Sequence, residues 1–186
     1  MLSTIFAHGL ESSPGGTKAV YLKEHFGTFS LQLYDLVLSF QVDVLEEALA
    51  RSEQSVLIGS SLGGLASLGV ANRCPDRIAH LVLLAPAVSC HRREDAFEEA
   101  EKSRPGIREE AIEMQKLSVP AMIPTTIIHG LEDEIVLAED VLSLGARSPS
   151  ARLVFVHDDH PLSGSRDLIL STIGRAVAGS DPLILP

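Results

Sequence analysis

A serine at a predicted strand-to-helix corner is the residue of this chain best placed to do chemistry. Residues 55–65 contain a Gly-x-Ser-x-Gly motif centred on Ser61. A β-branched apolar run precedes the motif and apolar residues at helical spacing follow it, so a tight turn is predicted at Ser61. Gly59 and Gly63 lack a Cβ, which lets the strand and the helix approach closely. Ser61 is therefore the candidate nucleophile.

A serine hydroxyl is a weak nucleophile and needs a base, which a third group orients. Residues 125–136 predict a strand, a turn and a helix, and the turn is acidic. Because nucleophile corners of this kind use a carboxylate from a loop after a later strand, this turn is the expected source. Glu132, Asp133 and Glu134 are all candidates from their positions alone.

The base is expected after the last predicted strand, where the chain carries two histidines, His157 and His160. We favour His160 because it is expected at the head of the final helix, clear of the strand end. His157 would directly extend the strand instead. Asp158 and Asp159 are predicted to begin the capping turn of that helix.

Backbone amides must also stabilise the negative charge that develops on the attacked carbonyl oxygen, and each donor contributes ~3 kcal/mol. Leu62 follows the candidate nucleophile and would supply one N–H at a helix start. The second N–H is expected from the loop at residues 8–16. There Gly9 lets the backbone fold back towards the corner and Leu10 presents its amide.

The elements that must position these groups follow from the hydrophobic pattern. Six short apolar runs have strand length: residues 2–7, 30–34, 55–59, 80–85, 125–129 and 152–156. The segments between them place apolar residues at helical spacing, and Ser12 and Ser13 are predicted to cap the first such helix. This alternation predicts a compact α/β fold of about six parallel strands with helices on both faces. One domain over residues 1–186 is expected.

One charged segment interrupts the alternation after the fourth predicted strand. Half of the positions in residues 91–118 are charged, and Pro105-Gly106 breaks the segment in the middle. The pattern predicts two short helices, inserted at the sheet edge where open α/β sheets bind ligands. Two interpretations stay open, a small lid or pocket wall and a longer exposed crossover.

Composition narrows the partners and the compartment. The 186 residues carry a formal net charge of −10, which repels nucleic-acid backbones and anionic lipid surfaces. No apolar stretch approaches the ~18 residues that span a bilayer, so neither nucleic acid nor membrane is an expected partner. Cys74 and Cys90 match no zinc-binding spacing, and the N-terminus lacks the basic region of a signal peptide. These features favour a cytoplasmic protein.

Several of these residues together carry a resemblance to a known family. They are His8-Gly9, Gly59-Ser60-Ser61-Leu62-Gly63-Gly64, His129-Gly130-x-x-Asp133-x-x-Val136 and the late His160. The combination resembles the α/β-hydrolase superfamily over nearly the whole chain, and its His-Gly-x-x-Ser-Ser-Pro and Gly-Ser-Ser-Leu-Gly-Gly motifs are similar to the small YqiA-type esterases. The resemblance implies Ser61 as nucleophile, Asp133 as acid and His160 as base. It also implies the amides of Leu10 and Leu62 as oxyanion donors.

These expectations combine into a serine hydrolase that cleaves small carboxylic esters through an acyl-enzyme, without cofactor or metal. His8 and Gly9 are candidates for substrate contact, and a histidine before a glycine can also serve to hold a loop. One alternative is an acyl-CoA thioesterase, for which Arg92 and Arg93 offer a local basic patch. The other is a hydrolase-like binding or signalling module with little turnover.

Overall fold

The computed structural model describes residues 2–10, 12–33, 35–88 and 94–180, so Cys90, Arg92 and Arg93 lie outside the described residues. Within them, six strands form one sheet in the order β2-β1-β3-β4-β5-β6, and every neighbouring pair is parallel. The strands are β1 (Ser3–Ala7), β2 (Phe29–Ser30), β3 (Ser55–Ser60), β4 (Ile78–Leu84), β5 (Thr125–Gly130) and β6 (Ala151–Val156). The predicted α/β architecture of six parallel strands is confirmed.

The edge strand β2 is shorter than the sequence predicts, ending at Ser30 instead of residue 34. Only Phe29 and Ser30 pair with β1. Beyond them the N–H of Leu33 donates to the Nε2 atom of His8, 3.3 Å away. Because a side chain takes this donor, the ladder with β1 stops.

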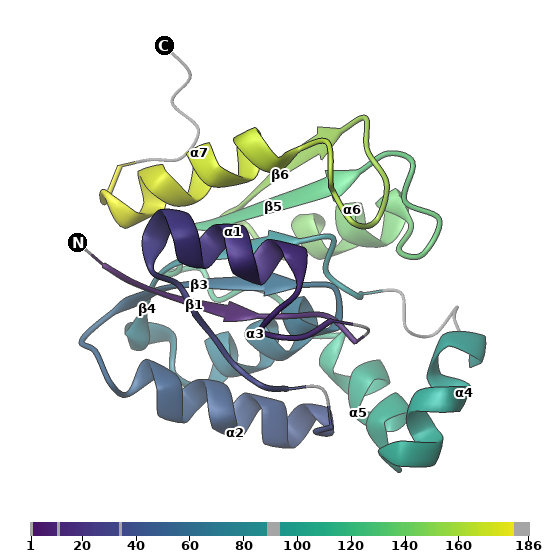
Figure 1. Cartoon of the computed structure of the whole chain (residues 1–186). Helices are drawn as coiled ribbons and strands as arrows, with labels where there is room; N and C mark the ends of the chain where they lie inside the picture. Colours follow the sequence, from purple (N-terminus) through teal and green to yellow (C-terminus); the bar gives the residue numbers. More distant parts are fainter. Residues whose placement is uncertain (1, 11, 34, 89–93, 181–186) are drawn as a thin grey trace.

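The helices lie on both faces of the sheet (Figure 1). In the described residues they are α1 (Thr17–Phe26), α2 (Leu38–Leu49), α3 (Leu62–Arg73), the 3-10 turn η1 (Pro75–Arg77), α4 (Glu94–Ser103), α5 (Ile107–Met114), α6 (Ala138–Ala146) and α7 (Arg166–Val177). Helices α1 and α7 cover one face, whereas α2, α3 and α6 cover the other. No helix of the described segments is both long and apolar enough to cross a membrane.

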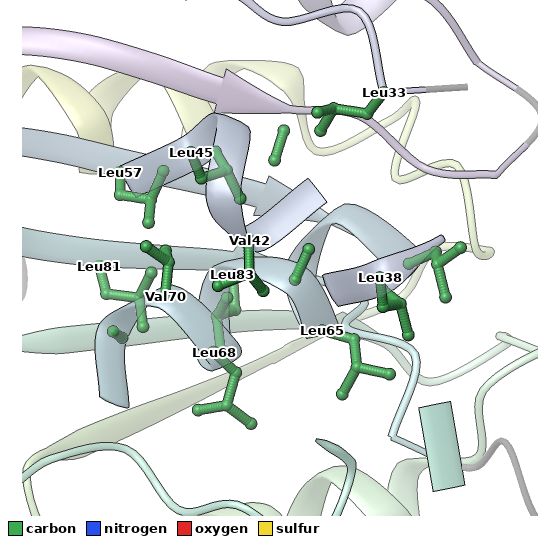
Figure 2. Close-up of a cluster of buried hydrophobic side chains, with 14 of the residues drawn as sticks. Leu33, Leu38, Val42, Leu45, Leu57, Leu65, Leu68, Val70, Leu81 and Leu83 are labelled. Atoms are coloured by element: carbon green, nitrogen blue, oxygen red, sulfur yellow. The ribbon is translucent and has the colours of Figure 1, made fainter. Parts of the chain in front are cut away.

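Successive strand residues supply two separate cores, as the period of two in a β-strand requires. In β3, Leu57 packs under α2 and α3, while Val56 and Ile58 pack under α1 and α7. Figure 2 shows the first of these cores, in which Leu57 lies against the helices together with Leu45 and other aliphatic side chains. Each such buried leucine contributes roughly 1.5–3 kcal/mol relative to exposure. The continuous burial of β3 on both sides fixes the strand whose end carries Ser61.

The charged segment after β4 forms the two predicted helices, α4 and α5, separated at Pro105-Gly106. Gly106 has a φ of 87°, a left-handed conformation that favours glycine. The carboxylate of Glu110 in α5 accepts hydrogen bonds from the N–H and hydroxyl of Ser39, at 2.9 and 2.8 Å. These bonds attach α5 to the start of α2. Whether the segment acts as a lid stays a prediction.

Candidate active site

Ser61 stands at the turn between β3 and α3 in a strained backbone conformation. Its φ of 54° and ψ of −122° are costly for a residue with a Cβ, and such strain gathers at functional sites. The turn is held from both sides, because the N–H of Ser61 donates to the Leu84 carbonyl and the Ser61 carbonyl accepts from Ala87, each at 3.0 Å. The corner therefore presents the Ser61 side chain at the carboxyl edge of the sheet.

The motif glycines are required by close backbone approach. A Cβ built on Gly63 would stand 2.3 Å from the Ala7 carbonyl oxygen, and one built on Gly59 would stand 2.7 Å from Cα of Gly64. Contacts this short are not tolerated without displacement of the backbone. The tight packing of β1, β3 and α3 around Ser61 therefore explains both glycines of the motif.

Ser61, His160 and Asp133 form one hydrogen-bonded chain. Nε2 of His160 lies 3.0 Å from Oγ of Ser61, and Nδ1 of His160 lies 2.7 Å from Oδ2 of Asp133. An ionised carboxylate only accepts, so Nδ1–H donates to Asp133 and Nε2 is left to accept the hydroxyl proton of Ser61. The His160 side chain is 16% exposed, and it lines the same cavity as Ser61.

Asp133 is held as an anion by its neighbours. It is 6% exposed, and its second oxygen accepts the N–H groups of Ile135 and Val136, both at 2.8 Å. Burial pushes the pKa of Asp133 upward, but the hydrogen bonds from His160 and from the two amides outweigh burial and leave this pKa below its ordinary value. Glu132 and Glu134, the other two acids of this turn, are exposed.

The loops that carry Asp133 and His160 are braced against each other. The N–H of Leu131 donates to the Val156 carbonyl at 2.8 Å, and the N–H of Glu132 donates to the Asp158 carbonyl at 3.0 Å. A Cβ built on Gly130 would stand 2.2 Å from that same Asp158 oxygen. Gly130 is therefore what allows the loop after β6 to lie across the end of β5.

The expected position of His160 at the head of the final helix is wrong. Helix α7 begins only at Arg166, so His160 lies in the loop at residues 157–165. Asp158 holds this loop because its carboxylate accepts hydrogen bonds from the hydroxyl group of Ser165 at 2.7 Å and from the N–H of Asp159 at 3.0 Å. The two aspartates therefore shape a longer loop, and neither caps the helix directly.

The residues expected to form the oxyanion hole lie next to Ser61. Leu62 is the first residue of α3, a position whose N–H has no acceptor within the helix. A Cβ built on Gly9 would stand 2.9 Å from Cβ of Ser61, so the loop after β1 runs directly past the corner. Leu10 follows in that loop and lines the same cavity as Leu62.

His8 is buried and is not one of the residues that line the cavity. It is 2% exposed, its Nδ1 bonds the Gly9 carbonyl at 2.9 Å, and its Nε2 accepts from the Leu33 N–H. Both ring nitrogens are used by backbone groups, so His8 holds the loop in shape. Gly9, in contrast, is part of the cavity wall.

A cavity of about 630 Å³ opens above Ser61. Its apolar wall comes from the α3 and α4 side of the sheet and includes Leu62, Ala87, Phe97, Ile135 and Val136. Its polar wall comes from the α1 and α7 side, where Phe6, Pro161 and Leu162 also line the cavity, and includes Ser12, Thr17, Lys18, Tyr21, Ser163 and Arg166. Sequence reasoning missed most of this polar wall; the spacing of Lys18 and Tyr21 on one helix face was the available signal.

In the described segments, no group of three or more His, Cys, Asp or Glu side chains is arranged to hold a metal ion.

Ser12 and Ser13, predicted to cap α1, do not do so: the residue before the helix is Gly16, with no side-chain cap. Ser12 instead lines the cavity.

The parallel sheet, its helices on both faces and the serine corner define an α/β-hydrolase fold, and solved structures agree. Alpha/beta hydrolase domain-containing protein 10 from mouse has a TM-score of 0.77 at 22% identity, covering 95% of this chain and 89% of its own. Est1E from Butyrivibrio proteoclasticus has 0.73 at 18%, covering 95% and 88%. The monoacylglycerol lipase of Paleococcus ferrophilus has 0.72 at 14%, covering 95% and 94%.

The sequence itself identifies a narrower group. The chain belongs to UPF0227, described as "Uncharacterised protein family (UPF0227)", whose model matches residues 3–139. No curated protein matches the sequence. These findings confirm the superfamily resemblance seen in the motifs.

Proposed function

We propose that this protein is a serine hydrolase that cleaves small carboxylic esters through an acyl-enzyme. The observation that carries the proposal is the hydrogen-bonded chain from Ser61 through His160 to Asp133, set on a strained corner that opens into a cavity. A nucleophile, its base and the group that orients the base are the three parts that acyl transfer requires.

In the first half of the reaction, Oγ of Ser61 attacks the ester carbonyl carbon while Nε2 of His160 takes the hydroxyl proton. The carbonyl oxygen becomes an oxyanion, which the N–H groups of Leu10 and Leu62 stabilise. Asp133 stabilises the imidazolium and keeps its ring oriented. The C–O bond to the leaving group then breaks, and His160 returns the proton to the departing alcohol.

In the second half, a water molecule attacks the acyl-enzyme. His160 takes a proton from the water as the new oxyanion forms, then returns it to Oγ of Ser61 as the acid leaves. The cavity volume of about 630 Å³ lies in the ordinary range for small-molecule sites. Its apolar wall suits an aliphatic acyl group.

The decisive experiment combines turnover and covalent labelling. We expect the wild-type protein to hydrolyse short-chain nitrophenyl esters and to react with a fluorophosphonate at Ser61, with Ser61→Ala losing both and kcat falling by roughly 10³-fold or more. Ser60→Ala, at the variable position just before the nucleophile, is the matched control and should retain the label. Undiminished turnover in Ser61→Ala would overturn the assignment.

An acyl thioester is the second candidate substrate, because cations are present where an anionic carrier would enter. Lys18 and Arg166 both line the cavity, although the chain as a whole is acidic. Measuring kcat/KM on acyl-CoA and on an oxygen ester of the same acyl group separates the two. A higher value for the thioester would replace the ester proposal.

A further inference from the structure

The polar wall of the cavity brings three donor side chains together from two helices. Lys18 and Tyr21 lie one turn apart on α1, and Arg166 is the first residue of α7. All three line the cavity that contains Ser61 and His160. The guanidinium carbon of Arg166 lies 4.9 Å from the centre of the Tyr21 ring, so the two helices join their polar groups at one place.

Tyr21 contributes its hydroxyl to this wall. The residue is only 5% exposed, but its hydroxyl oxygen is not among the buried, unpartnered polar atoms of the described residues, so this oxygen is accessible from the cavity that Tyr21 lines. Burial raises the pKa of Tyr21 to about 12, against a smaller opposing effect of Arg166, so the phenol keeps its proton at neutral pH. A protonated phenol hydroxyl that is accessible from the cavity is a neutral donor that a bound ligand can use.

The ammonium group of Lys18, like the hydroxyl of Tyr21, is available as a donor to a ligand. In the described ranges no carboxylate lies within 4.0 Å of its ammonium group, although Asp158 and Asp159 act on it from farther away. Its pKa is lowered, chiefly by burial, while these two aspartates oppose that effect. The desolvation cost of Lys18 is therefore offset only in part, by two aspartates that do not form a close ion pair with it in the described chain.

The start of α1 adds backbone donors to this wall. Gly16 precedes the helix without a side-chain cap, and the first turn contains no acidic residue. The first N–H groups of a helix lack internal acceptors, and the helix dipole makes this end attractive to anions. Thr17, which begins the helix, itself lines the cavity.

We propose that this wall is a subsite for an anionic oxygen group, a carboxylate or a phosphate, carried by the substrate some bonds away from its ester. Lys18 and Arg166 supply the charge, and Tyr21 supplies a neutral donor. The inference rests on the proposed function and narrows it, since a neutral aliphatic ester would offer Lys18 and Arg166 no opposite charge. Lys18, Tyr21 and Arg166 are thus assigned as specificity-determining residues.

The kinetic test uses pairs of esters that differ only in charge. One pair is the mono-nitrophenyl ester of glutaric acid and its methyl-capped diester; a second pair carries a phosphate monoester and a hydroxyl at the same position. We expect kcat/KM to be roughly 10-fold or more higher for the charged member of at least one pair, as charge-assisted hydrogen bonds allow. The pair that shows the larger preference identifies the group as carboxylate or phosphate.

Variants test whether the polar wall of the cavity causes the preference for charged esters. Lys18→Met should reduce the ratio of charged to neutral kcat/KM by most of its value, and Tyr21→Phe, which keeps the ring packing, should reduce it by less. Lys23→Met is the matched control, because Lys23 is exposed on the last turn of the same helix and should leave the ratio unchanged. Equal turnover of charged and neutral esters by the wild type would overturn the subsite.

A binding measurement separates failure of the subsite from failure of the proposed function. Glutarate and inorganic phosphate are titrated calorimetrically into Ser61→Ala, with and without Lys18→Met. Binding that Lys18→Met weakens supports the subsite even if no ester is turned over. Turnover of neutral esters with Ser61 labelling, but without any anion binding or charge preference, supports the hydrolase and refutes the subsite.

Discussion

Gly9 lies against Ser61 so closely that a Cβ built on Gly9 would stand 2.9 Å from Cβ of Ser61 and 3.5 Å from its Oγ. This contact joins the loop after β1 to the corner after β3. We predict that Gly9→Ala displaces the loop and lowers kcat by roughly 10- to 100-fold, because small misplacements of catalytic groups have effects of this size. Steady-state kinetics measures the fall in kcat, and thermal unfolding of the same variant shows whether the fold is retained.

The control for Gly9→Ala is Gly15→Ala in the same loop. A Cβ on Gly15 would meet only Oγ of Ser13, at 3.7 Å, which is ordinary contact. If both variants lose activity equally, the effect belongs to loop flexibility, and the close approach to Ser61 is not the cause.

The proximity of Gly9, Ser61, Asp133 and His160 was predictable because it follows from local motifs at the ends of parallel strands. Strand ends meet at one edge of the sheet, so a glycine, a serine, an acid and a histidine after four strands converge there. The polar wall was not predictable in this way. Its position depends on α1 packing beside α7, a contact between distant segments that no local pattern specifies.

The second prediction concerns the orientation of the His160 ring. In Asp133→Asn, the two amides at Oδ1 of Asp133 hold the new carbonyl oxygen, so the side-chain NH₂ faces Nδ1 of His160. Nδ1 must then accept, which places the ring proton on Nε2, where it cannot take the proton of Ser61. We expect kcat to fall about 10⁴-fold.

One control variant accompanies the Asp133→Asn measurement. Glu132→Gln neutralises the exposed neighbouring acid and should change kcat by less than about 2-fold, as surface substitutions usually do. A comparable loss in Glu132→Gln would indicate that the general negative charge of the turn matters, and the specific hydrogen bond does not.

The third prediction links Asp133 to stability. Its pKa in the folded protein is lowered because the hydrogen bonds from His160 and two amides outweigh burial. A carboxyl whose folded pKa is depressed stabilises the fold above its unfolded pKa of about 3.9, and this contribution is lost as the pH falls further. In urea unfolding, the stability advantage of wild type over Asp133→Asn should therefore be larger at about pH 6 than at about pH 3. An advantage independent of pH would contradict this explanation.

His129 also makes stability fall towards low pH, but over a higher pH range than Asp133. The residue is fully buried in β5, neither of its ring nitrogens has a hydrogen-bond partner among the described residues, and Nδ1 lies 3.8 Å from Oδ2 of Asp133. Burial lowers the pKa of His129 more than Asp133 and the nearby Val136 backbone raise it. The unfolded chain therefore binds a proton at higher pH than the folded chain does, and stability falls as the pH drops below about 6.5.

The fourth prediction follows for His129→Leu, which removes both unsatisfied nitrogens and keeps an apolar side chain. Its free energy of unfolding should be similar to wild type near pH 7 and should exceed wild type progressively towards about pH 5. Urea titrations across this range measure the difference. A wild type that is the more stable form at pH 5 would show that His129 is protonated in the fold and paired with Asp133.

The limit of sequence reasoning is also visible at His160. Its participation could be predicted, yet its placement at a helix head was wrong because Asp158 and Ser165 close a longer loop through their side chains. The charged segment at residues 91–118 was likewise predictable only in part. Its two helices followed from charge pattern and Pro105-Gly106, whereas the contact of one of them with the cavity depends on tertiary packing.

That contact gives the last prediction, which distinguishes a pocket wall from an exposed crossover. Phe97 of α4 is 5% exposed and lines the cavity on its apolar side. Phe97→Ala should lower stability by roughly 3–5 kcal/mol and should raise kcat/KM for octanoyl relative to acetyl esters, because the truncated side chain leaves room for a longer acyl group. Glu98→Ala, at the exposed neighbouring position, should leave the octanoyl-to-acetyl ratio unchanged. A uniform loss across all chain lengths in Phe97→Ala would mean that α4 packs on the domain without shaping the substrate site.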